Sequence, residues 1–249
     1  MSDTTGNLQY GTDTLEVISA ATKFNQWMYD TIKPFCKGNI LEIGSGIGNI
    51  SQFFVSEGAN ITLSDFDTGY FNRLKEKFGE KQNMKGIHHI DLSVKNPVEL
   101  YPGLINKFDT VFALNVVEHI EDQQQALLNA HTFLREGGRV VILVPAFKWL
   151  YNSFDKQLGH YRRYTKGSLQ NLIRTTGFEV IHAQYFNSIG TVGWFMSGNI
   201  MKKKMIPQGQ MKLYDSLVPF WKLIDKFTNP FIGLSVISVG KKKHLKSYN

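Results

Sequence analysis

The chain alternates between short apolar runs and longer stretches in which apolar residues recur at helical spacing. The apolar runs predict strands at 39–43, 61–63, 87–90, 110–114, 139–144 and 178–185. The amphipathic stretches predict helices at 15–32, 47–57, 70–78, 122–134 and 168–176. Strands that alternate with helices in this rhythm form βαβ units, so the sequence predicts an α/β fold with a doubly wound, mainly parallel sheet.

This rhythm ends near residue 186. Residues 188–230 are rich in Gly, Trp, Met and Lys, with one helix predicted at 212–227, and a last strand is predicted at 231–239. We expect a single domain over 1–249. Its expected parts are an N-terminal helical segment at 1–35, a core at 36–186, a lid or insertion at 187–230, and a last strand with a basic tail at 231–249.

The composition is that of a folded protein, with 42% hydrophobic and 20% charged residues. The first residues lack the pattern of a secretory signal, and no apolar run is long enough to span a bilayer. The only cysteine, Cys36, excludes an internal disulfide and is interpreted as a packed side chain. We therefore expect a cytoplasmic protein.

The positive charge is concentrated near the C-terminus. Residues 1–201 carry 18 Lys+Arg and 19 Asp+Glu, a balance of −1, whereas residues 202–249 carry 10 Lys and 2 Asp, a balance of +8. This asymmetry indicates an anionic partner, such as a lipid surface or a phosphorylated substrate. A solvated basic face that aids solubility is the alternative.

The most informative segment is 40–49, where an apolar strand runs into a glycine-rich turn that opens a helix. Gly44, Gly46 and Gly48 allow the backbone to turn sharply and approach a ligand. Dinucleotide-binding loops follow the pattern G-x-G-x-x-G, whereas this chain has G-x-G-x-G. Glu42, just before the turn, would repel a pyrophosphate and suits a cationic amino-acid group.

Two further acids follow the next predicted strands. Asp65 ends the second strand, where a carboxylate can accept hydrogen bonds from both hydroxyls of a ribose. Asp91 follows the third strand and can accept from an adenine amino group, while Leu92 offers an apolar contact or a backbone donor. Each acid alone could be a helix cap or a turn former. Acids at the carboxyl ends of three successive strands indicate an adenosyl ligand, because open α/β sheets bind ligands at that edge.

These motifs resemble those of the class I S-adenosylmethionine-dependent methyltransferases over roughly residues 36–186. The matching segments are 40–48, 64–65, 90–92, 108–119 and 134–138. The resemblance implies a seven-stranded sheet of order 3-2-1-4-5-7-6, with the last strand antiparallel and an insertion before it.

The resemblance also implies which residues bind S-adenosyl-L-methionine. Those for the methionine part are Glu42, Gly44, Ser45, Gly46 and Gly48. Those for the adenosyl part are Asp65, Asp91 and Leu92. Those beyond the fourth strand, which would line the methionyl side and the pocket wall, are Asn115, Val116 and His119.

Two other classes of protein are alternatives. A nicotinamide-dependent oxidoreductase would have a similar fold, but Glu42, Asn49 in place of the third dinucleotide glycine and the lack of a Tyr-x-x-x-Lys pair near the crevice disfavour it. A non-catalytic adenosyl-ligand-binding protein of the same fold is disfavoured because the cofactor set is intact.

The segment after the fourth strand bears on the acceptor and on metal. Enzymes that methylate exocyclic amines of nucleic-acid bases usually carry Asn/Asp-Pro-Pro-aromatic there, and this chain has Leu-Asn-Val-Val-Glu, so we expect no nucleic-acid partner. The segment resembles small-molecule O-methyltransferases, including those of ubiquinone biosynthesis, some of which hold a metal with Glu-x-x-Glu-His. Asn115 replaces the first carboxylate and leaves Glu118 and His119, a poor set for a hard cation, so we expect no metal.

A second polar cluster lies at 159–165, after the fifth strand. His160 is the candidate general base, because a neutral imidazole can take a proton near pH 7. The candidate substrate contacts of this cluster are Tyr161, Arg162, Arg163 and Tyr164. The two arginines could bind a carboxylate or phosphate. In the alternative, Thr165 caps the next helix, Tyr164 packs beneath it and the arginines pair with acids. Similar loops occur in bacterial methyltransferases that accompany glycosyltransferases.

Residues 188–206 join bulky apolar side chains to three lysines at 202–204. Such a segment can cover an apolar substrate, with Trp194 as a candidate contact. It can also lie at a membrane interface, or pack on the sheet as an ordinary helix. Contact of this segment and the basic C-terminal region with the inner face of the membrane is therefore one expectation. The sequence does not predict an oligomeric state.

Together these patterns predict methyl transfer from S-adenosyl-L-methionine to a small-molecule acceptor. We expect the acceptor atom to be a hydroxyl oxygen of a lipid-, quinone- or sugar-linked molecule or a natural product. Methylation of a small amine is the alternative.

Overall fold

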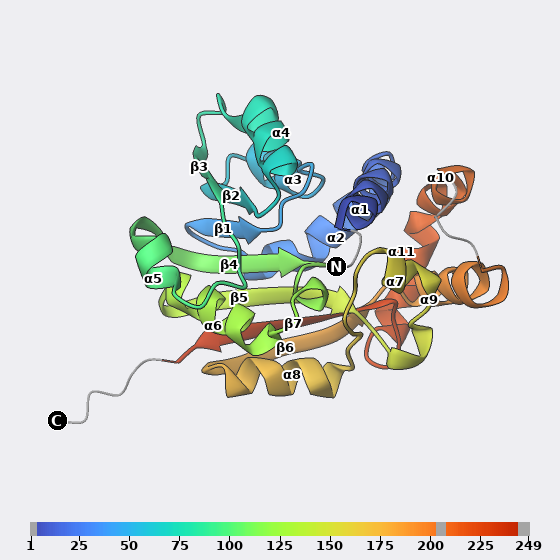
Figure 1. The fold of residues 1–249 in the computed structure, drawn as a ribbon. Coiled ribbons are helices and arrows are strands. Elements are labelled where there is room, and N and C mark those ends of the chain that lie inside the picture. The colour runs from blue at the N-terminus through green and yellow to red at the C-terminus, as the bar shows by residue number, and fades with distance from the viewer. Residues whose placement is uncertain (1–3, 203–207, 244–249) are drawn as a thin grey trace.

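The computed structural model describes residues 4–202 and 208–243, with side chains from residue 11 onward except that of residue 208. Its strands are β1 (Ile40–Ile43), β2 (Ile61–Asp65), β3 (Met84–His89), β4 (Phe108–Leu114), β5 (Leu134–Pro145), β6 (Phe178–Phe186) and β7 (Ser235–Lys242). They form one sheet of order β3-β2-β1-β4-β5-β7-β6 (Figure 1). Strands β1 to β5 pair in parallel, and β7 runs antiparallel to β5 and β6. The predicted fold class and strand order are therefore confirmed.

Helices cover both faces of this sheet (Figure 1). In the first half of the chain they are α1 (Thr4–Ser19), α2 (Thr22–Ile32), α3 (Ser51–Ser56), α4 (Thr68–Phe78), α5 (Pro97–Leu100) and α6 (Gln123–Phe133). In the second half they are α7 (Ser153–Gln157), α8 (Lys166–Thr175), α9 (Ser188–Trp194), α10 (Gln208–Ser216) and α11 (Val218–Thr228), with a π-helical turn at Phe195–Ile200 after α9.

The sheet separates two hydrophobic cores. Along β5, Val140 and Ile142 belong to the core shared with α6 and α8, whereas Val141 and Leu143 belong to the core shared with α2 and α3. Successive residues of a strand point to opposite faces, so a strand covered on both sides is a continuous apolar run. This is why hydrophobicity alone predicts the positions of the central strands.

Two predicted helices differ from the structure at their boundaries. The helix expected at 15–32 is divided into α1 and α2, and the Asn25 side chain donates to the Ile18 carbonyl at the end of α1 (2.8 Å). The same carbonyl also accepts the Ala21 N–H (2.9 Å), so both bonds close the end of α1. The helix expected at 47–57 begins only at Ser51, because Gly48 has φ +80° and cannot be helical.

Gly137 and Gly138, which follow the helix predicted at 122–134, lie inside β5. Gly137 has φ +73°, and the pairing of β4 with β5 shifts register between Phe108 and Thr110. The glycine therefore bends the strand rather than preceding it.

The second half of the chain is more regular than expected. The helix expected at 212–227 is two helices, with Pro219 in the first turn of α11, where its missing N–H costs no helical bond. The last strand begins at Ser235 and includes Lys242, so two lysines of the expected tail belong to the sheet. The Lys242 ammonium is buried and donates to the Leu134 carbonyl (2.7 Å). Residues 203–207 and 244–249 of the expected lid and tail lie outside the described residues.

Candidate functional site

The glycine-rich turn forms the first wall of the site, at the carboxyl end of β1. Gly44, Gly46 and Gly48 have φ values of +69°, +55° and +80°, a region that favours glycine. A Cβ atom at Gly44 would clash with the side chain of Val116, which follows β4. The turn thus passes close to the segment after β4, with Val116 packed directly against it.

Two buried acids lie beside this turn. Glu42 and Asp65 are each 4% exposed. The Ser51 hydroxyl donates to Glu42 Oε2 (2.5 Å), and the Gly46 N–H donates to Asp65 Oδ2 (2.8 Å). Burial raises the pKa of Glu42 to about 7, with a smaller contribution from the nearby charge of Asp65. Burial also raises the pKa of Asp65. A cation delivered to this edge would favour ionisation of both acids.

The two residues expected to bind the adenine, Asp91 and Leu92, differ in their burial and in their hydrogen bonds. Asp91 Oδ1 accepts hydrogen bonds from the Ser93 N–H (2.8 Å) and the Ser93 hydroxyl (2.6 Å). This acid therefore stabilises the turn that follows β3. The Leu92 side chain is buried in the hydrophobic core, and its carbonyl accepts from Asn129 (2.9 Å). The expected apolar contact of Leu92 with a ligand is therefore wrong, because its side chain faces inward.

Beyond β4, the chain turns sharply into the site. Asn115 is exposed and has φ +54°, and its N–H donates to the Leu143 carbonyl (2.8 Å). His119 is also exposed, and its ring lies edge to face with the His160 ring. Desolvation, and then the neighbouring His160, lower the pKa of His119 to about 3. His119 is therefore a neutral imidazole in a sheltered but solvent-accessible place.

This edge fits S-adenosyl-L-methionine by the chemistry of its groups. Two buried acids, Glu42 and Asp65, lie beside the glycine turn, and acids suit the cationic ammonium and sulfonium groups of the ligand. A pyrophosphate would meet the same acids as like charges. The residues that would hold the cofactor are thus Glu42, the turn at 44–48, Asp65, Asp91 and Asn115.

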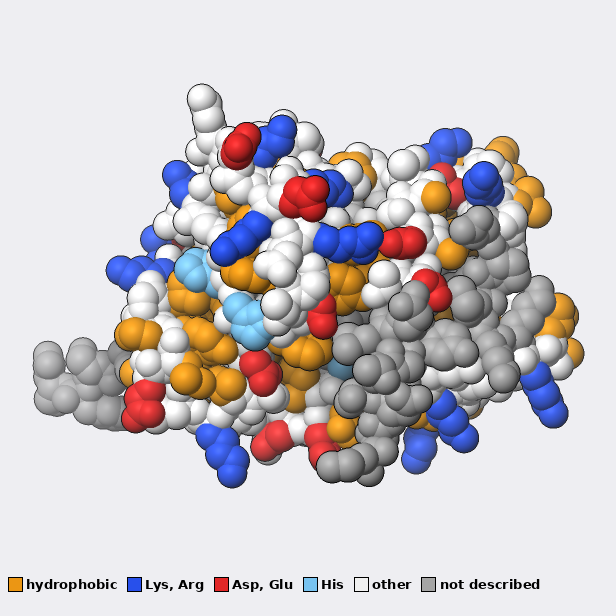
Figure 2. Space-filling model, turned by 45° about the horizontal axis from the view of Figure 1, so that its top comes forward, with side chains coloured by type: hydrophobic (Ala, Val, Ile, Leu, Met, Phe, Trp, Pro, Cys, Tyr) orange, Lys and Arg blue, Asp and Glu red, His pale blue; other side chains and the backbone are white. Residues whose placement is uncertain are grey.

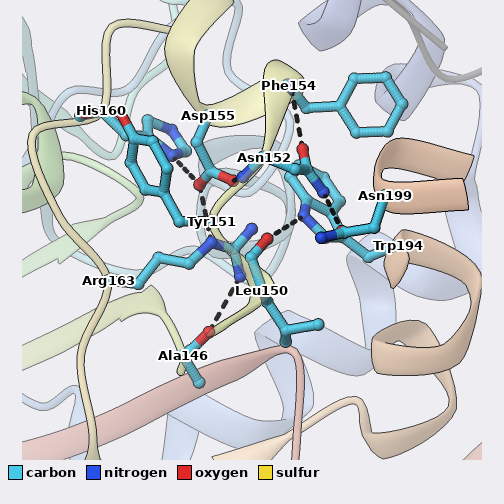
Figure 3. A network of polar contacts seen from close by, with 10 residues as sticks. All are labelled: Ala146, Leu150, Tyr151, Asn152, Phe154, Asp155, His160, Arg163, Trp194 and Asn199. Carbon is cyan, nitrogen blue, oxygen red and sulfur yellow. Dashed lines mark hydrogen bonds and ion pairs between the residues drawn. The ribbon is translucent and has the colours of Figure 1, made fainter. Parts of the chain in front are cut away.

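The second wall of the site is a buried ion cluster centred on Asp155 of α7 (Figure 3). His160 Nδ1 donates to Asp155 Oδ1 (2.8 Å), and Arg163 Nε donates to the same oxygen (2.7 Å). The Asn152 N–H donates to Oδ2 (3.0 Å). Burial alone would raise the pKa of Asp155, but the hydrogen bond from His160 and the Arg163 charge outweigh it and lower the pKa. The carboxylate thereby fixes the tautomer and orientation of His160.

Two of the expected substrate contacts, Arg163 and Tyr164, are buried and bonded within the protein. Arg163 is buried, donates also to the Ala146 carbonyl (2.9 Å) and lies 4.8 Å over the Trp194 ring. Tyr164 is buried in the core, where its hydroxyl bonds to Gln123 (2.8 Å). Arg163 and Tyr164 therefore position the loop instead of meeting a substrate.

The other expected substrate contacts differ in solvent exposure and in their hydrogen bonds. Arg162 donates to the carbonyls of Ile120 and Glu121 (3.1 and 2.8 Å), so it holds the segment after β4. Tyr161 is exposed, and Trp194 is half-buried with its N–H directed at the Leu150 carbonyl (3.2 Å). Thr165 caps α8, as the alternative interpretation expected.

The two walls meet at Glu118, His119 and His160. The Tyr161 N–H donates to the Glu118 carbonyl (2.8 Å), and the two histidine rings lie edge to face with centroids 4.6 Å apart. Each of the three residues has a ligand-type atom within 4.8 Å of the others. Both carboxylate oxygens of Glu118 are buried with no hydrogen-bond partner among the described residues. Burial raises the pKa of Glu118 to about 8.

Such a cluster has the composition of a site for a divalent cation or for a shared proton. Sequence reasoning considered Glu118 and His119 together but did not connect them with His160, and it missed Asp155 altogether. The available signal was an acid five residues before a histidine in a loop, which is too common a pattern to be specific.

Comparison with known proteins places this geometry in a family. A family model described as a methyltransferase domain matches residues 20–183. The lovastatin nonaketide synthase of Monascus pilosus is 29% identical over 110 residues, which are 42% of this chain and 4% of that protein. The chain thus matches a small fraction of the length of this curated relative.

Solved structures with the same fold include two methyltransferases. Phosphoethanolamine N-methyltransferase 2 of Haemonchus contortus, in complex with S-adenosyl-L-methionine, aligns with a TM-score of 0.57 and 18% identity over 88% of this chain and 52% of that chain. A SAM-dependent methyltransferase of Archaeoglobus fulgidus aligns with a TM-score of 0.57 and 16% identity over 88% of this chain and 94% of that chain.

The family match covers most of the chain, and the chain belongs to the methyltransferase-domain family. With the observed strand order, this confirms the predicted class: an S-adenosylmethionine-dependent methyltransferase of the class I fold, with S-adenosyl-L-methionine as its cofactor.

Proposed function

We propose that this enzyme transfers the methyl group of S-adenosyl-L-methionine to a hydroxyl oxygen of a small molecule bound beside His160. The observation that carries the proposal is the Asp155–His160 pair, which is held by a buried arginine and placed against the end of β4. A histidine oriented by a carboxylate is the arrangement that general-base catalysis requires.

The cofactor residues divide as the resemblance implies. Glu42 and the turn at 44–48, with Asn115 and Val116, would bind the methionine part. Asp65 would bind the ribose, and Asp91 with the Leu92 N–H would bind the adenine. When bound, S-adenosyl-L-methionine supplies an electrophilic methyl group. The protein then has to hold an acceptor oxygen in line with it and exclude water.

His160 is the residue proposed to take the hydroxyl proton. Because Nδ1 donates to Asp155, Nε2 carries the lone pair and can accept a proton from the acceptor. The imidazolium that forms would be stabilised by the Asp155 carboxylate, which itself stays ionised because of Arg163. Tyr161 and Trp194 are the side chains proposed to contact the acceptor.

We propose that a proton, not a metal ion, fills the space between Glu118 and the histidines. Burial raises the pKa of Glu118 to about 8, which favours its protonated form at neutral pH. Its oxygens are enclosed, and the three groups spread over up to 4.8 Å, wider than the roughly 3.3 Å that ligands about 2.1 Å from one ion would span. Metal should therefore be dispensable.

A small amine is the second candidate acceptor, since a relative of similar fold is a phosphoethanolamine N-methyltransferase. A neutral histidine can also take a proton from an ammonium group. The hydroxyl is preferred because Arg163, which could have bound the phosphate of a charged headgroup, is already paired with Asp155.

We further propose that the enzyme works in the cytoplasm and reaches the inner face of the membrane through its basic C-terminal region.

Transfer of a radiolabelled methyl group from S-adenosyl-L-methionine to a panel of hydroxylated and amine acceptors tests this proposal. The expected result is label in hydroxylated lipid-, quinone- or sugar-linked compounds, and loss of that label in His160→Ala. Label confined to amines would favour the second candidate. Label that survives His160→Ala unchanged would overturn the role of the histidine.

A further inference from the structure

Helix α11 turns its apolar face toward solvent. At 3.6 residues per turn, Phe220, Leu223, Ile224 and Phe227 fall on an arc of about 100°. Phe220, Leu223 and Phe227 are 65%, 56% and 74% exposed. On the opposite side of the helix Asp225 is buried. The usual arrangement of an amphipathic helix is thus reversed.

The buried acid explains why the helix sits this way round. Asp225 accepts hydrogen bonds from the N–H groups of Asn187 (3.1 Å) and Ser188 (2.7 Å), at the start of α9. On the same inner side Val218 is buried, and Trp221 stacks on Tyr214. Because specific polar contacts fix the inner face, the outward apolar face is a stable feature of the surface.

The apolar region continues beyond the helix. Phe231 is 77% exposed and Ile232 is also exposed. We term the six side chains the α11 surface: Phe220, Leu223, Ile224, Phe227, Phe231 and Ile232. The neighbouring α9 and its π-helical turn add exposed Val192, Met196 and Ile200. Figure 2 shows hydrophobic and basic side chains at the right-hand end of the molecule, where Figure 1 places α9 and α10. Exposed apolar regions of this extent mark interaction sites.

The charge on α10 and α11 favours an anionic partner. Of their two acids, Asp225 is buried and Asp215 accepts the Phe24 N–H (2.7 Å). Lys212 and Lys226 are exposed, whereas Lys222 pairs with Asp30. Two copies of this chain meeting here would oppose the same positive charges, while an anionic bilayer would attract them.

We propose that the α11 surface binds an anionic lipid bilayer, with the phenylalanines in the acyl boundary and the lysines at the headgroups. No helix of the described residues is long and apolar enough to cross a membrane, so the mode proposed is peripheral. Two contacts connect the α11 surface with the candidate site. Asp225 accepts a hydrogen bond from the start of α9, and Trp194 at the end of α9 lies against Arg163 (Figure 3). Resting on the proposed function, we infer that the acceptor is an amphiphile presented by the bilayer.

Vesicle flotation of the full chain tests this proposal without any acceptor or cofactor. Vesicles of 30% phosphatidylglycerol in phosphatidylcholine should capture the protein, and vesicles of phosphatidylcholine alone should capture much less. The triple variant Phe220→Ser, Leu223→Ser, Phe227→Ser should lose about tenfold or more in partitioning, because three large apolar groups no longer enter the interface. The matched triple Val98→Ser, Leu100→Ser, Leu128→Ser removes exposed apolar groups of α5 and α6 and should bind like the wild type.

Each other outcome overturns the proposal. Equal binding by the α11 triple variant would mean that the lysines act alone. A dimer in solution that dissociates in the same variant, with no vesicle binding, would show that a second copy covers the surface. Calorimetric titration with S-adenosyl-L-methionine separates this test from the proposed function, since the α11 variant should keep wild-type cofactor affinity.

Discussion

The two halves of the candidate site balance their charges in opposite ways. In the cofactor half, Glu42 and Asp65 are buried among hydroxyl and backbone donors, and burial raises the pKa of each. In the acceptor half, Asp155 is just as buried but receives His160 and Arg163, and its pKa is lowered. In the proposed function, the first half receives a cation only when the cofactor binds. The second half is already neutralised, and its charges serve to hold one imidazole in place.

The strongest test of the acceptor half is His160→Ala. If His160 takes the acceptor proton, turnover should fall by about 10²–10⁴-fold while cofactor affinity stays unchanged. The acid limb of the rate–pH profile should also vanish, because an imidazolium cannot accept a proton. His182→Ala, a half-buried histidine of β6, is the control and should keep wild-type turnover. A purely structural role would instead lower the melting temperature, with residual turnover that follows the folded fraction.

Asp155→Ala should lower the free energy of unfolding more than substitution of Glu42 or Asp65 would. It leaves the buried guanidinium of Arg163 without its carboxylate, which costs about 3–5 kcal/mol of unfolding free energy. Denaturant unfolding measures this loss. Asp122→Ala removes an exposed helix cap of α6 and should cost only about 1 kcal/mol. Equal losses in the two variants would show that the ion cluster is not a buried network in solution.

Asp65→Ala should affect binding more than folding. Loss of hydrogen bonds to the cofactor ribose should weaken S-adenosyl-L-methionine by about 1–3 kcal/mol in a calorimetric titration. Asp30→Ala, an exposed acid of α2, serves as the control and should leave affinity unchanged. Unchanged affinity in Asp65→Ala would place the ribose elsewhere.

Metal removal should have the smallest effect. Turnover after dialysis against a chelator should equal that of untreated enzyme, because Asn115 replaces the carboxylate expected of metal-using relatives and burial favours the protonated form of Glu118. Loss of turnover that magnesium or zinc restores would make Glu118, His119 and His160 ligands, and would remove His160 from the role of base.

The residues proposed to bind the cofactor can be selected from the sequence because the motifs that mark them are local. The glycine turn follows its strand without interruption, and the acids stand at the ends of strands that hydrophobicity alone identifies. Leu92 was the exception, since its orientation depends on packing against the core.

The acceptor half depends on contacts between distant segments. The Glu118 carbonyl accepts the Tyr161 N–H from another loop, and Arg163 pairs with Asp155 of a short helix within an expected loop. The apolar face of α11 shows the same limit. An amphipathic pattern does not say which face turns inward, and here Asp225 reverses it.

The most direct test of the central contrast is the pH dependence of S-adenosyl-L-methionine binding. Glu42, with a pKa of about 7, must lose a proton before it can pair with a cationic ligand. Affinity should therefore rise about tenfold from pH 6 to pH 8 and then level off, because the acid is ionised above its pKa. The rise should disappear in Glu42→Gln, and nicotinamide cofactors should not bind at either pH. Wild-type affinity that is flat across this range, or tight binding of NAD, would contradict the account.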